Sequence, residues 1–267
     1  MKIKNIYLTQ LYLIIALTCT FCKNKSADLQ VNKNQSVNLV SNDSFDYLPL
    51  STYNQVITHS FYTLSYAEQY EQAEWVAYEL KPTAGNNKHY KRPFFIQDAL
   101  VKTESADWRN YKKSGYDKGH LCPAADMAFS VKAYNDTFYT SNISPQTHAF
   151  NSGVWNTLEQ KVRYWAQKYN GIYVITGPVL RGTLKKIGKE HVAVPEYFYK
   201  IVFKKSETET KMIAFLVPSA GNEKPLYDYA LSVDELEKRT GINFFPALPD
   251  PLENELEANN SYKMWSF

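Results

Sequence analysis

The sequence lacks a strong excess of charge of either sign. Thirty lysines and arginines stand against 27 aspartates and glutamates, so the formal net charge is +3 at pH 7. Lys2 and Lys4 lie in the N-terminal segment, and without residues 1–22 the balance becomes 28 minus 27, or +1. The overall charge therefore does not indicate nucleic-acid binding, for which a strongly basic domain is the usual sign. Any phosphate contact must come from a local group of cations.

Cysteine and long apolar runs are scarce as well. The only cysteines are Cys19, Cys22 and Cys122. The first two end a segment in which basic residues precede a short apolar run, a pattern typical of an export signal and too short for a membrane span. We predict an exported protein that is periplasmic, secreted or attached to the cell envelope through a lipid on Cys19 or Cys22. Cys122 would then have no disulfide partner and is predicted to be a small buried thiol rather than a nucleophile.

Composition divides the chain into four parts. Residues 1–22 are the predicted signal peptide or lipoprotein signal, and residues 23–50, rich in Asn, Ser, Asp and Lys, predict a flexible lead-in. Residues 51–250 predict one folded domain, and residues 251–267 a C-terminal tail. There is no internal repeat, and aromatic residues make up 15% of the chain, which excludes a disordered protein.

Strand and helix patterns are mixed in the folded part. Alternating or β-rich runs predict strands at 60–66, 75–80, 137–143 (ended by Pro145), 172–176 (followed by a turn at 177–178), 197–203 and 211–217. From Ser152, apolar residues recur at steps of three and four and predict a helix that Gly171 ends. A capping box at Ser232 starts a second helix, which ends at Gly241. Mixing without strict alternation favours the α+β class.

Residues 114–121 read Ser-Gly-Tyr-Asp-Lys-Gly-His-Leu and hold the candidate base. We predict that His120 is a general base, since an imidazole titrates near pH ~6.5 and accepts a proton from water at neutral pH. A single histidine is more often a surface or core residue. Gly119 and Asp117 favour the catalytic role here, because a glycine lets the backbone turn tightly at a strand end. His148 is the alternative base.

A segment rich in asparagine follows and holds the candidate metal ligands. We predict that Asn151 binds Mg²⁺ directly, since this ion prefers oxygen ligands and often takes only one or two from protein. The alternative for Asn151 is a helix N-cap. Glu159 lies eight residues further along the predicted helix, a rise of roughly 12 Å, and on one stripe with Asn151 and Trp155. We predict that Glu159 holds a metal-bound water; the alternative is an ordinary solvated glutamate.

The remaining candidates are an amide and several cations. Asn142 could orient His120 or the phosphate, although a turn-forming asparagine fits nearly as well. Lys118 is a predicted phosphate contact and Arg92 a second. A local basic approach to the site is predicted from Lys102, Arg109, Lys112 and Lys113. This combination of base, cation, oxygen ligand and carboxylate predicts a nuclease.

These motifs resemble the DNA/RNA non-specific endonuclease family, which includes secreted bacterial nucleases and mitochondrial endonuclease G. The family motif Asp-Arg-Gly-His stands here as Asp-Lys-Gly-His at residues 117–120. The resemblance extends from about residue 75 to residue 245. Downstream agreement includes Leu121, Pro123 to Met127, Ser141 to Ile143, Pro145, Gln146, Asn151, Gly153, Trp155, Leu158, Glu159 and Thr176 to Pro178.

The resemblance implies a ββα-metal site on a central, mostly antiparallel sheet flanked by helices. It also implies Mg²⁺ or Mn²⁺ as cofactor, DNA and RNA as substrates, and products with 5′-phosphate ends. By motif, it assigns His120 as the base, Asn151 as the metal ligand, Glu159 as the holder of metal waters and Asn142 as a supporting residue. Lys118 replaces the usual arginine, and a lysine cannot contact a phosphate bidentately. Cys122 stands where alanine is common.

Two other functions remain open at this point. One is an exported lipoprotein that binds nucleic acid on a nuclease fold without cutting it. The other is a metal-dependent phosphodiesterase that acts on small substrates. The sequence also leaves the oligomeric state open, with a homodimer as one candidate, and does not decide between DNA and RNA.

Overall fold

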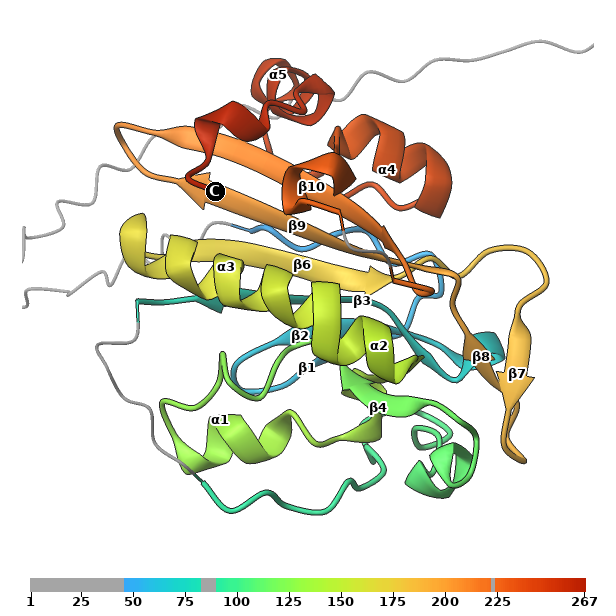
Figure 1. The fold of residues 1–267 in the computed structure, drawn as a ribbon. Helices are drawn as coiled ribbons and strands as arrows, with labels where there is room; N and C mark the ends of the chain where they lie inside the picture. Colours follow the sequence, from blue (N-terminus) through green and yellow to red (C-terminus); the bar gives the residue numbers. More distant parts are fainter. Residues whose placement is uncertain (1–45, 83–89, 222–223) are drawn as a thin grey trace, which may run out of the picture. The chain divides into compact units, whose positions relative to one another are not determined.

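Seven strands, each antiparallel to its neighbours, form the centre of the protein (Figure 1). The computed structural model describes residues 46–82, 90–221 and 224–267. The strand order is β1-β2-β3-β6-β9-β10-β11. The bounds are β1 (Val56–Thr58), β2 (Thr63–Ala67), β3 (Gln72–Leu80), β6 (Ile172–Pro178), β9 (Tyr197–Lys205), β10 (Thr210–Pro218) and β11 (Ala230–Leu231). Strands and helices are mixed, so the α+β prediction is confirmed.

Both faces of this sheet are buried, because side chains alternate between two cores along each strand. On β3, Val76 and Tyr78 belong to the core that contains helix α3 (Asn156–Lys168). Trp75 and Ala77 belong to the opposite core, with α4 (Val233–Thr240) and α5 (Asp250–Ala258). The sheet therefore separates α3 from α4 and α5, as Figure 1 shows.

The helical segment before and within α3 starts earlier than predicted. It consists of α2 (His148–Phe150), a π-helical turn η4 (Asn151–Trp155) and α3. The Thr147 hydroxyl accepts a hydrogen bond from the Phe150 N–H and caps the segment. The buried stripe from Trp155 to Trp165 on α3 agrees with the predicted period, and Gly171 follows the helix with a φ of +97°.

A two-stranded ribbon stands beside the main sheet. It pairs β4 (Asp117–His120) with β5 (Ile143–Gln146) in antiparallel register. The strand predicted at 137–143 is wrong in its position along the sequence. That stretch mostly forms a 3-10 turn, η3 (Thr140–Asn142), and the strand begins at its end and includes Pro145. A proline is tolerated there because each strand of a two-stranded ribbon is an edge strand.

A small separate core supports the ribbon. It contains Phe95, Phe138 and Ile143 together with β7 (Lys185–Ile187) and β8 (Val192–Val194). The remaining short elements are η1 (Glu68–Tyr70), η2 (Trp108–Tyr111), α1 (Val131–Asp136), η5 (Leu226–Tyr229) and η6 (Tyr262–Met264).

The turn predicted at Gly177 and Pro178 is also wrong, because both residues continue β6 and pair with β9. Glycine is required at 177 by close packing: a Cβ there would lie 2.2 Å from the Glu74 carbonyl oxygen. The strands predicted near 60–66, 75–80, 197–203 and 211–217 and the helix capped by Ser232 are confirmed.

The two ends of the chain bear on the remaining predictions. The predicted signal and nearly all of the lead-in lie outside the described residues. Residues 251–267 include most of α5 and end near Trp265, which is buried with its ring 4.8 Å from that of Trp165 on α3. Among the described residues, no helix combines the length and the apolar character needed to span a membrane.

Candidate active site

His120 lies at the end of β4 with its ring enclosed by aromatic side chains. The ring centroids of Phe138 and Phe95 are 4.9 and 5.6 Å away. The imidazole Nε2 is buried and has no hydrogen-bond partner among the described residues. Burial, with the nearby Arg92 charge, lowers the pKa of His120 to about 3. The ring is therefore neutral at physiological pH, which is the form that a general base requires.

Gly119 allows β4 and β5 to approach each other closely. A Cβ at this position would lie 2.1 Å from the side chain of Gln146, which is fully buried. The glycine predicted beside His120 thus serves close packing against β5. Its role is not the tight turn that the sequence suggested, because residues 117–120 form a paired strand.

Asn142 forms hydrogen bonds with the backbone of the segment that directly follows His120. Its Oδ1 accepts a hydrogen bond from the Cys122 N–H at 2.8 Å, and its Nδ2 donates to the carbonyls of Cys122 and Thr137 at 3.0 and 2.9 Å. Its own carbonyl accepts from the Leu121 N–H at 2.9 Å. The side chain is fully buried and bonded only to backbone, so its contacts are those of a residue that positions the His120 loop. Cys122 is buried, as predicted.

Asp117 connects β4 to the helical segment that carries Asn151. Its Oδ2 accepts hydrogen bonds from Asn151 Nδ2 at 3.0 Å and from His148 Nδ1 at 2.9 Å. These contacts lower the pKa of Asp117 despite its partial burial. His148 is mostly exposed and holds this carboxylate. Asp117 and His120 both lie on β4, so the strand that carries the motif histidine also holds the side chain of the predicted metal ligand, Asn151.

The π-helical turn changes the predicted relation between Asn151 and Glu159. The argument from a regular rise of 1.5 Å per residue does not apply, because the backbone leaves helical geometry at Gly153 (φ −98°, ψ −115°). Asn151 is not the N-cap either, since Thr147 fills that position. The kink at Gly153 separates Asn151 from the regular helix α3, so their relative direction is not that of one continuous helix.

Glu159 faces a group of buried charges on the inner side of α3. Burial raises its pKa to about 7; Lys200 and Arg163 oppose that rise, and Asp126 adds to it. Asp126 is buried, accepts a hydrogen bond from Arg163 at 2.7 Å and accepts another from the Tyr78 hydroxyl at 2.8 Å. Glu159 is therefore not an ordinary solvated helix glutamate, which was the alternative.

Lys200 is the residue of this group that sequence reasoning missed. It is completely buried in the middle of β9, where its Nζ donates to Thr176 Oγ1 at 3.1 Å and lies 4.7 Å from the centre of the Trp155 ring. A lysine between Phe198 and Val202, which both face α3, was the available signal. Such a lysine needs a buried anion, and Glu159 lies on the facing helix.

The predicted phosphate-contacting cations gather around the same aromatic pair as His120. Lys118 Nζ lies 5.4 Å from the centre of the Phe95 ring, and Arg92 Cζ lies 5.4 and 5.6 Å from Phe95 and Phe138. Arg92 itself is exposed. This arrangement places the exposed Arg92 charge near the ring of His120.

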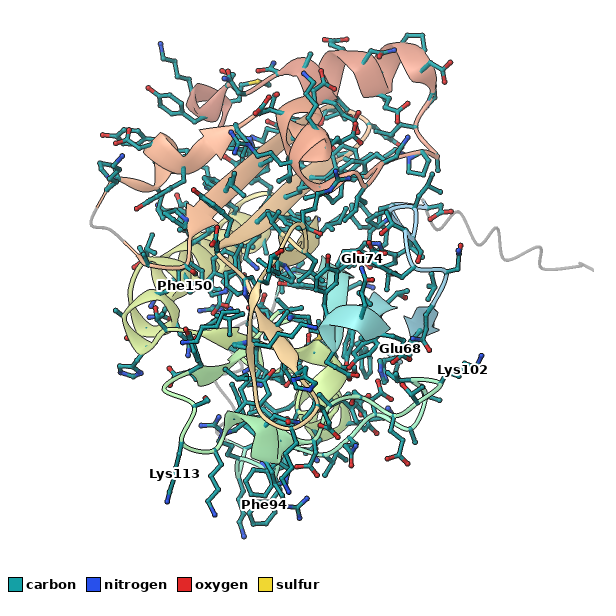
Figure 2. All side chains as sticks on the ribbon, turned by 90° about the vertical axis from the view of Figure 1, so that its right-hand side faces the viewer. Glu68, Glu74, Phe94, Lys102, Lys113 and Phe150 are labelled. Carbon is teal, nitrogen blue, oxygen red and sulfur yellow. The ribbon has the colours of Figure 1, made fainter. Side chains whose placement is uncertain are left out.

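The wider basic approach is less uniform than predicted. Figure 2 shows Lys113 projecting near Phe94 at the lower edge, while Lys102 projects from another part of the surface. Arg109 is paired with Asp107 at 2.5 Å. Phe94 is 91% exposed, which gives this edge an apolar side chain next to the cations.

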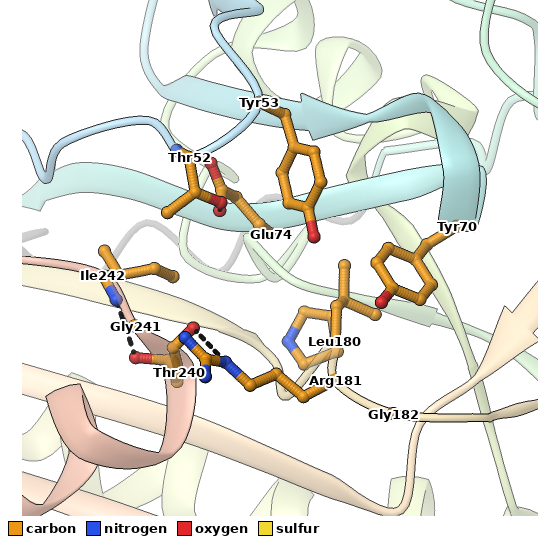
Figure 3. A pocket seen from close by; sticks show the side chains of 11 residues that line it. Thr52, Tyr53, Tyr70, Glu74, Leu180, Arg181, Gly182, Thr240, Gly241 and Ile242 are labelled. Carbon is orange, nitrogen blue, oxygen red and sulfur yellow. Dashed lines mark hydrogen bonds between the residues drawn. The ribbon is translucent and has the colours of Figure 1, made fainter.

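A separate cavity of about 400 Å³ lies elsewhere, between the β3 and α4 regions (Figure 3). Glu74 and Arg181 are among its lining residues, but none of the six predicted site residues is. The Glu74 carboxylate is already bonded to Thr52 and Ser65. The cavity therefore does not compete with His120 as the site of phosphodiester chemistry.

The residues present fit one hard cation. Asn151 uses its Nδ2 for Asp117, which leaves its Oδ1 as an oxygen ligand. The orphaned Nε2 of His120 is a second polar atom that a hydrated group would satisfy. An amide oxygen with few other protein ligands is the kind of site that Mg²⁺ occupies while it keeps several waters.

Comparison with known proteins agrees with this geometry. The family model described as DNA/RNA non-specific endonuclease matches residues 45–251. The chain is 34% identical over 229 residues to "Nuclease EXOG, mitochondrial" of Danio rerio, covering 78% of this chain and 66% of the relative. It is 30% identical to "Endonuclease G, mitochondrial" of Bos taurus, covering 72% and 69%. A solved structure, "Crystal structure of the EndoG/EndoGI complex: Mechanism of EndoG inhibition", matches with a TM-score of 0.69 at 29% identity, covering 75% and 88%.

These relatives also bear on length and location. The chain spans just under two thirds of the Danio rerio protein. The prediction of an exported, periplasmic or secreted protein is wrong on this comparison, because the relatives that match are named as mitochondrial nucleases. The attachment through a lipid on Cys19 or Cys22 finds no support either. The basic and apolar N-terminal pattern is short, and such a pattern alone does not determine the cellular location of a protein.

Proposed function

Because this chain belongs to the DNA/RNA non-specific endonuclease family, we propose that it is a Mg²⁺-dependent endonuclease that hydrolyses phosphodiester bonds of DNA and RNA. We propose little sequence preference and products with 5′-phosphate ends. The observation that carries the proposal is that β4 carries both His120 and Asp117, and that the Asp117 carboxylate accepts a hydrogen bond from Asn151 Nδ2, which leaves Asn151 Oδ1 as the atom for a metal ion.

In this proposal His120 takes a proton from the attacking water. Its lowered pKa keeps the ring neutral, and its buried Nε2 has no other hydrogen-bond partner among the described residues. The negative charge of a bound phosphate would favour the protonated ring and so assist the proton transfer. The Phe138 and Phe95 rings fix its plane, and the Asn142 contacts fix the backbone behind it. A bound Mg²⁺ would supply charge stabilisation for the phosphate and the departing 3′-oxygen.

Asn151 would hold the cation through its Oδ1, and Glu159 would hold water in its hydration shell. Glu159 suits this indirect role, because the buried charges of Lys200 and Arg163 keep its carboxylate in place behind the site. Lys118 and Arg92 would contact the substrate phosphates. Contacts to the sugar-phosphate backbone of the nucleic acid, rather than to the edges of its bases, support binding with little sequence preference.

The test is cleavage by the full chain of closed circular DNA, linear DNA and RNA, with Mg²⁺ and with EDTA. We expect cutting of closed circles only with the metal, and a loss of about 10²–10⁴-fold in His120→Ala. Asn151→Ala should lose activity and require more Mg²⁺. Product fragments should ligate without prior phosphorylation, as 5′-phosphate ends do.

His191→Ala is the matched control, because His191 is exposed and contacts none of the site residues named here. It should cut like the wild type. Full activity of His120→Ala would move the base elsewhere, with His148 the first residue to replace. Metal-independent binding without cutting would instead support a nucleic-acid-binding protein, and activity on small diesters alone would support a phosphodiesterase.

A further inference from the structure

Three carboxylates from α4 and α5 converge on the face of the sheet opposite α3. One oxygen each from Asp234, Glu237 and Glu257 lies within 4.8 Å of the other two. Asp234 and Glu237 are partly exposed, and Glu257 is only 4% exposed. Both helices pack on the core opposite the candidate active site, so this group does not belong to that site.

The carboxylates have unequal local partners. Asp234 lies in the first turn of α4, where the helix dipole favours an acid. Glu237 Oε1 accepts a hydrogen bond from the Phe244 N–H at 2.9 Å. Glu257 has no such reason for its position, since its Oε1 is buried and no described residue gives it a hydrogen bond.

No cation of the described protein neutralises the group. None of the three carboxylates forms an ion pair within the described residues; the nearby Arg239 instead bonds Glu235. Burial, followed by the charges of Glu237, Glu253 and Asp234, raises the pKa of Glu257 to about 8. Packing three acids together without a counter-charge costs free energy unless a ligand or a proton is taken up.

We propose that Asp234, Glu237 and Glu257 bind a calcium ion that joins α4 to α5. Calcium binds oxygen at about 2.3–2.6 Å, so oxygens that lie within 4.8 Å of one another can share one ion. Three converging carboxylates favour calcium, because Mg²⁺ keeps several of its waters and usually takes only one or two protein carboxylates. Waters on the exposed side of Asp234 and Glu237 would complete the 6–8 ligands that calcium takes.

The ion would act on structure rather than on catalysis. α5 is a nine-residue helix whose contacts with α4 and β10 hold it on the sheet. A calcium ion between α4 and α5 would fix α5, and with it the cover of this core. With three carboxylates and a partly open side, we expect a dissociation constant of about 10⁻⁴–10⁻³ M, the range of weak calcium modules.

The experiment is thermal unfolding of the full chain carrying Asn151→Ala, which removes the proposed active-site ligand. Calcium is titrated against EDTA at pH 7.5. At calcium about 100-fold above the dissociation constant, the Tm should rise by roughly 5–11 °C. Adding Glu257→Gln should raise the Tm in EDTA, because folding no longer has to protonate or bury this carboxylate, and should abolish the calcium-dependent rise.

Glu255→Gln is the matched control, since Glu255 lies on the same helix, carries the same charge and is exposed. It should keep the full calcium response. A Tm that calcium leaves unchanged, while it falls as pH rises toward 8, would show that Glu257 shares a proton with its neighbours and would overturn the proposal. An equal calcium response in Glu257→Gln would also overturn it. Nuclease activity is not a readout here, so these outcomes are independent of the proposed function.

Discussion

Lys200→Met should destabilise the protein in a way that grows with pH. The substitution keeps the volume of a fully buried side chain but removes the positive charge that faces Glu159. Removing the positive charge that opposes a buried carboxylate costs up to roughly 3–5 kcal/mol when that carboxylate stays ionised. Glu159 can avoid this cost by keeping its proton, so the cost depends on whether the solution pH lies below or above its pKa.

The sign follows from the pKa of Glu159, which burial raises to about 7 against the opposing effect of Lys200. A carboxyl whose pKa is raised on folding loses stability as pH increases from the unfolded to the folded pKa. Without Lys200 the folded pKa lies higher still. Below pH 7, Glu159 therefore lowers the free energy of unfolding equally in the wild type and in Lys200→Met. Above it the variant loses about 1.4 kcal/mol more per pH unit, until its own pKa is reached.

Urea unfolding of the full chain at pH 6, 7, 8 and 9 in EDTA measures this difference. Lys204→Met is the matched control, because Lys204 lies four residues further on the same face of β9 and forms no ion pair with a described carboxylate. Its free-energy change should be small and independent of pH. A pH-independent loss in Lys200→Met, or one that matches the control, would refute the coupling of Lys200 to Glu159.

Three further outcomes are expected. Gly119→Ala places a Cβ 2.1 Å from the Gln146 side chain, so the free energy of unfolding should fall by roughly 1–3 kcal/mol in urea melts, and an unchanged melt would contradict the packing argument. Asn142→Ala removes three buried hydrogen bonds and leaves the Cys122 N–H unpaired, which should cost roughly 2–4 kcal/mol by the same assay; a loss below half a kilocalorie would argue against it. Since the pKa of Glu257 is raised to about 8, the Tm in EDTA should fall between pH 5 and pH 8, and Glu257→Gln should flatten that slope; equal slopes would disprove the assignment.

Local patterns predicted those parts of the fold in which neighbours in sequence determine the structure. The stripe from Trp155 to Trp165 and the Ser232 cap depend on contacts three or four residues apart, and both were predicted correctly. Pro145 and Pro178 were predicted to lie outside strands because proline lacks an N–H. Their pairing depends on which strand lies opposite, and sequence alone does not contain that information.

In the candidate site, too, residues within local motifs could be predicted and contacts between distant segments could not. His120, Asn151 and Glu159 belong to motifs whose spacing could be read directly, and in the structure Asp117, on the same strand as His120, holds the Asn151 side chain. Lys200 lies 41 residues after Glu159 and outside every motif. Only the placement of β9 beside β6 and below α3 turns it into a neighbour of Glu159. The π-turn at Asn151 was likewise hidden, because its sequence continues a helical pattern without a visible break.

The strand order has a consequence for how the protein is made. β9 lies between β6 and β10, and the core opposite α3 is closed by α4 and α5, which follow all seven strands of the sheet in the sequence. A nascent chain that has exposed residues 117–159 outside the ribosome still lacks Lys200 and the cover of its sheet. Pairings this far apart in sequence form slowly, since loop closure must precede them. The buried charge that faces Glu159 and the cover of the sheet are thus in place only after these later segments have emerged.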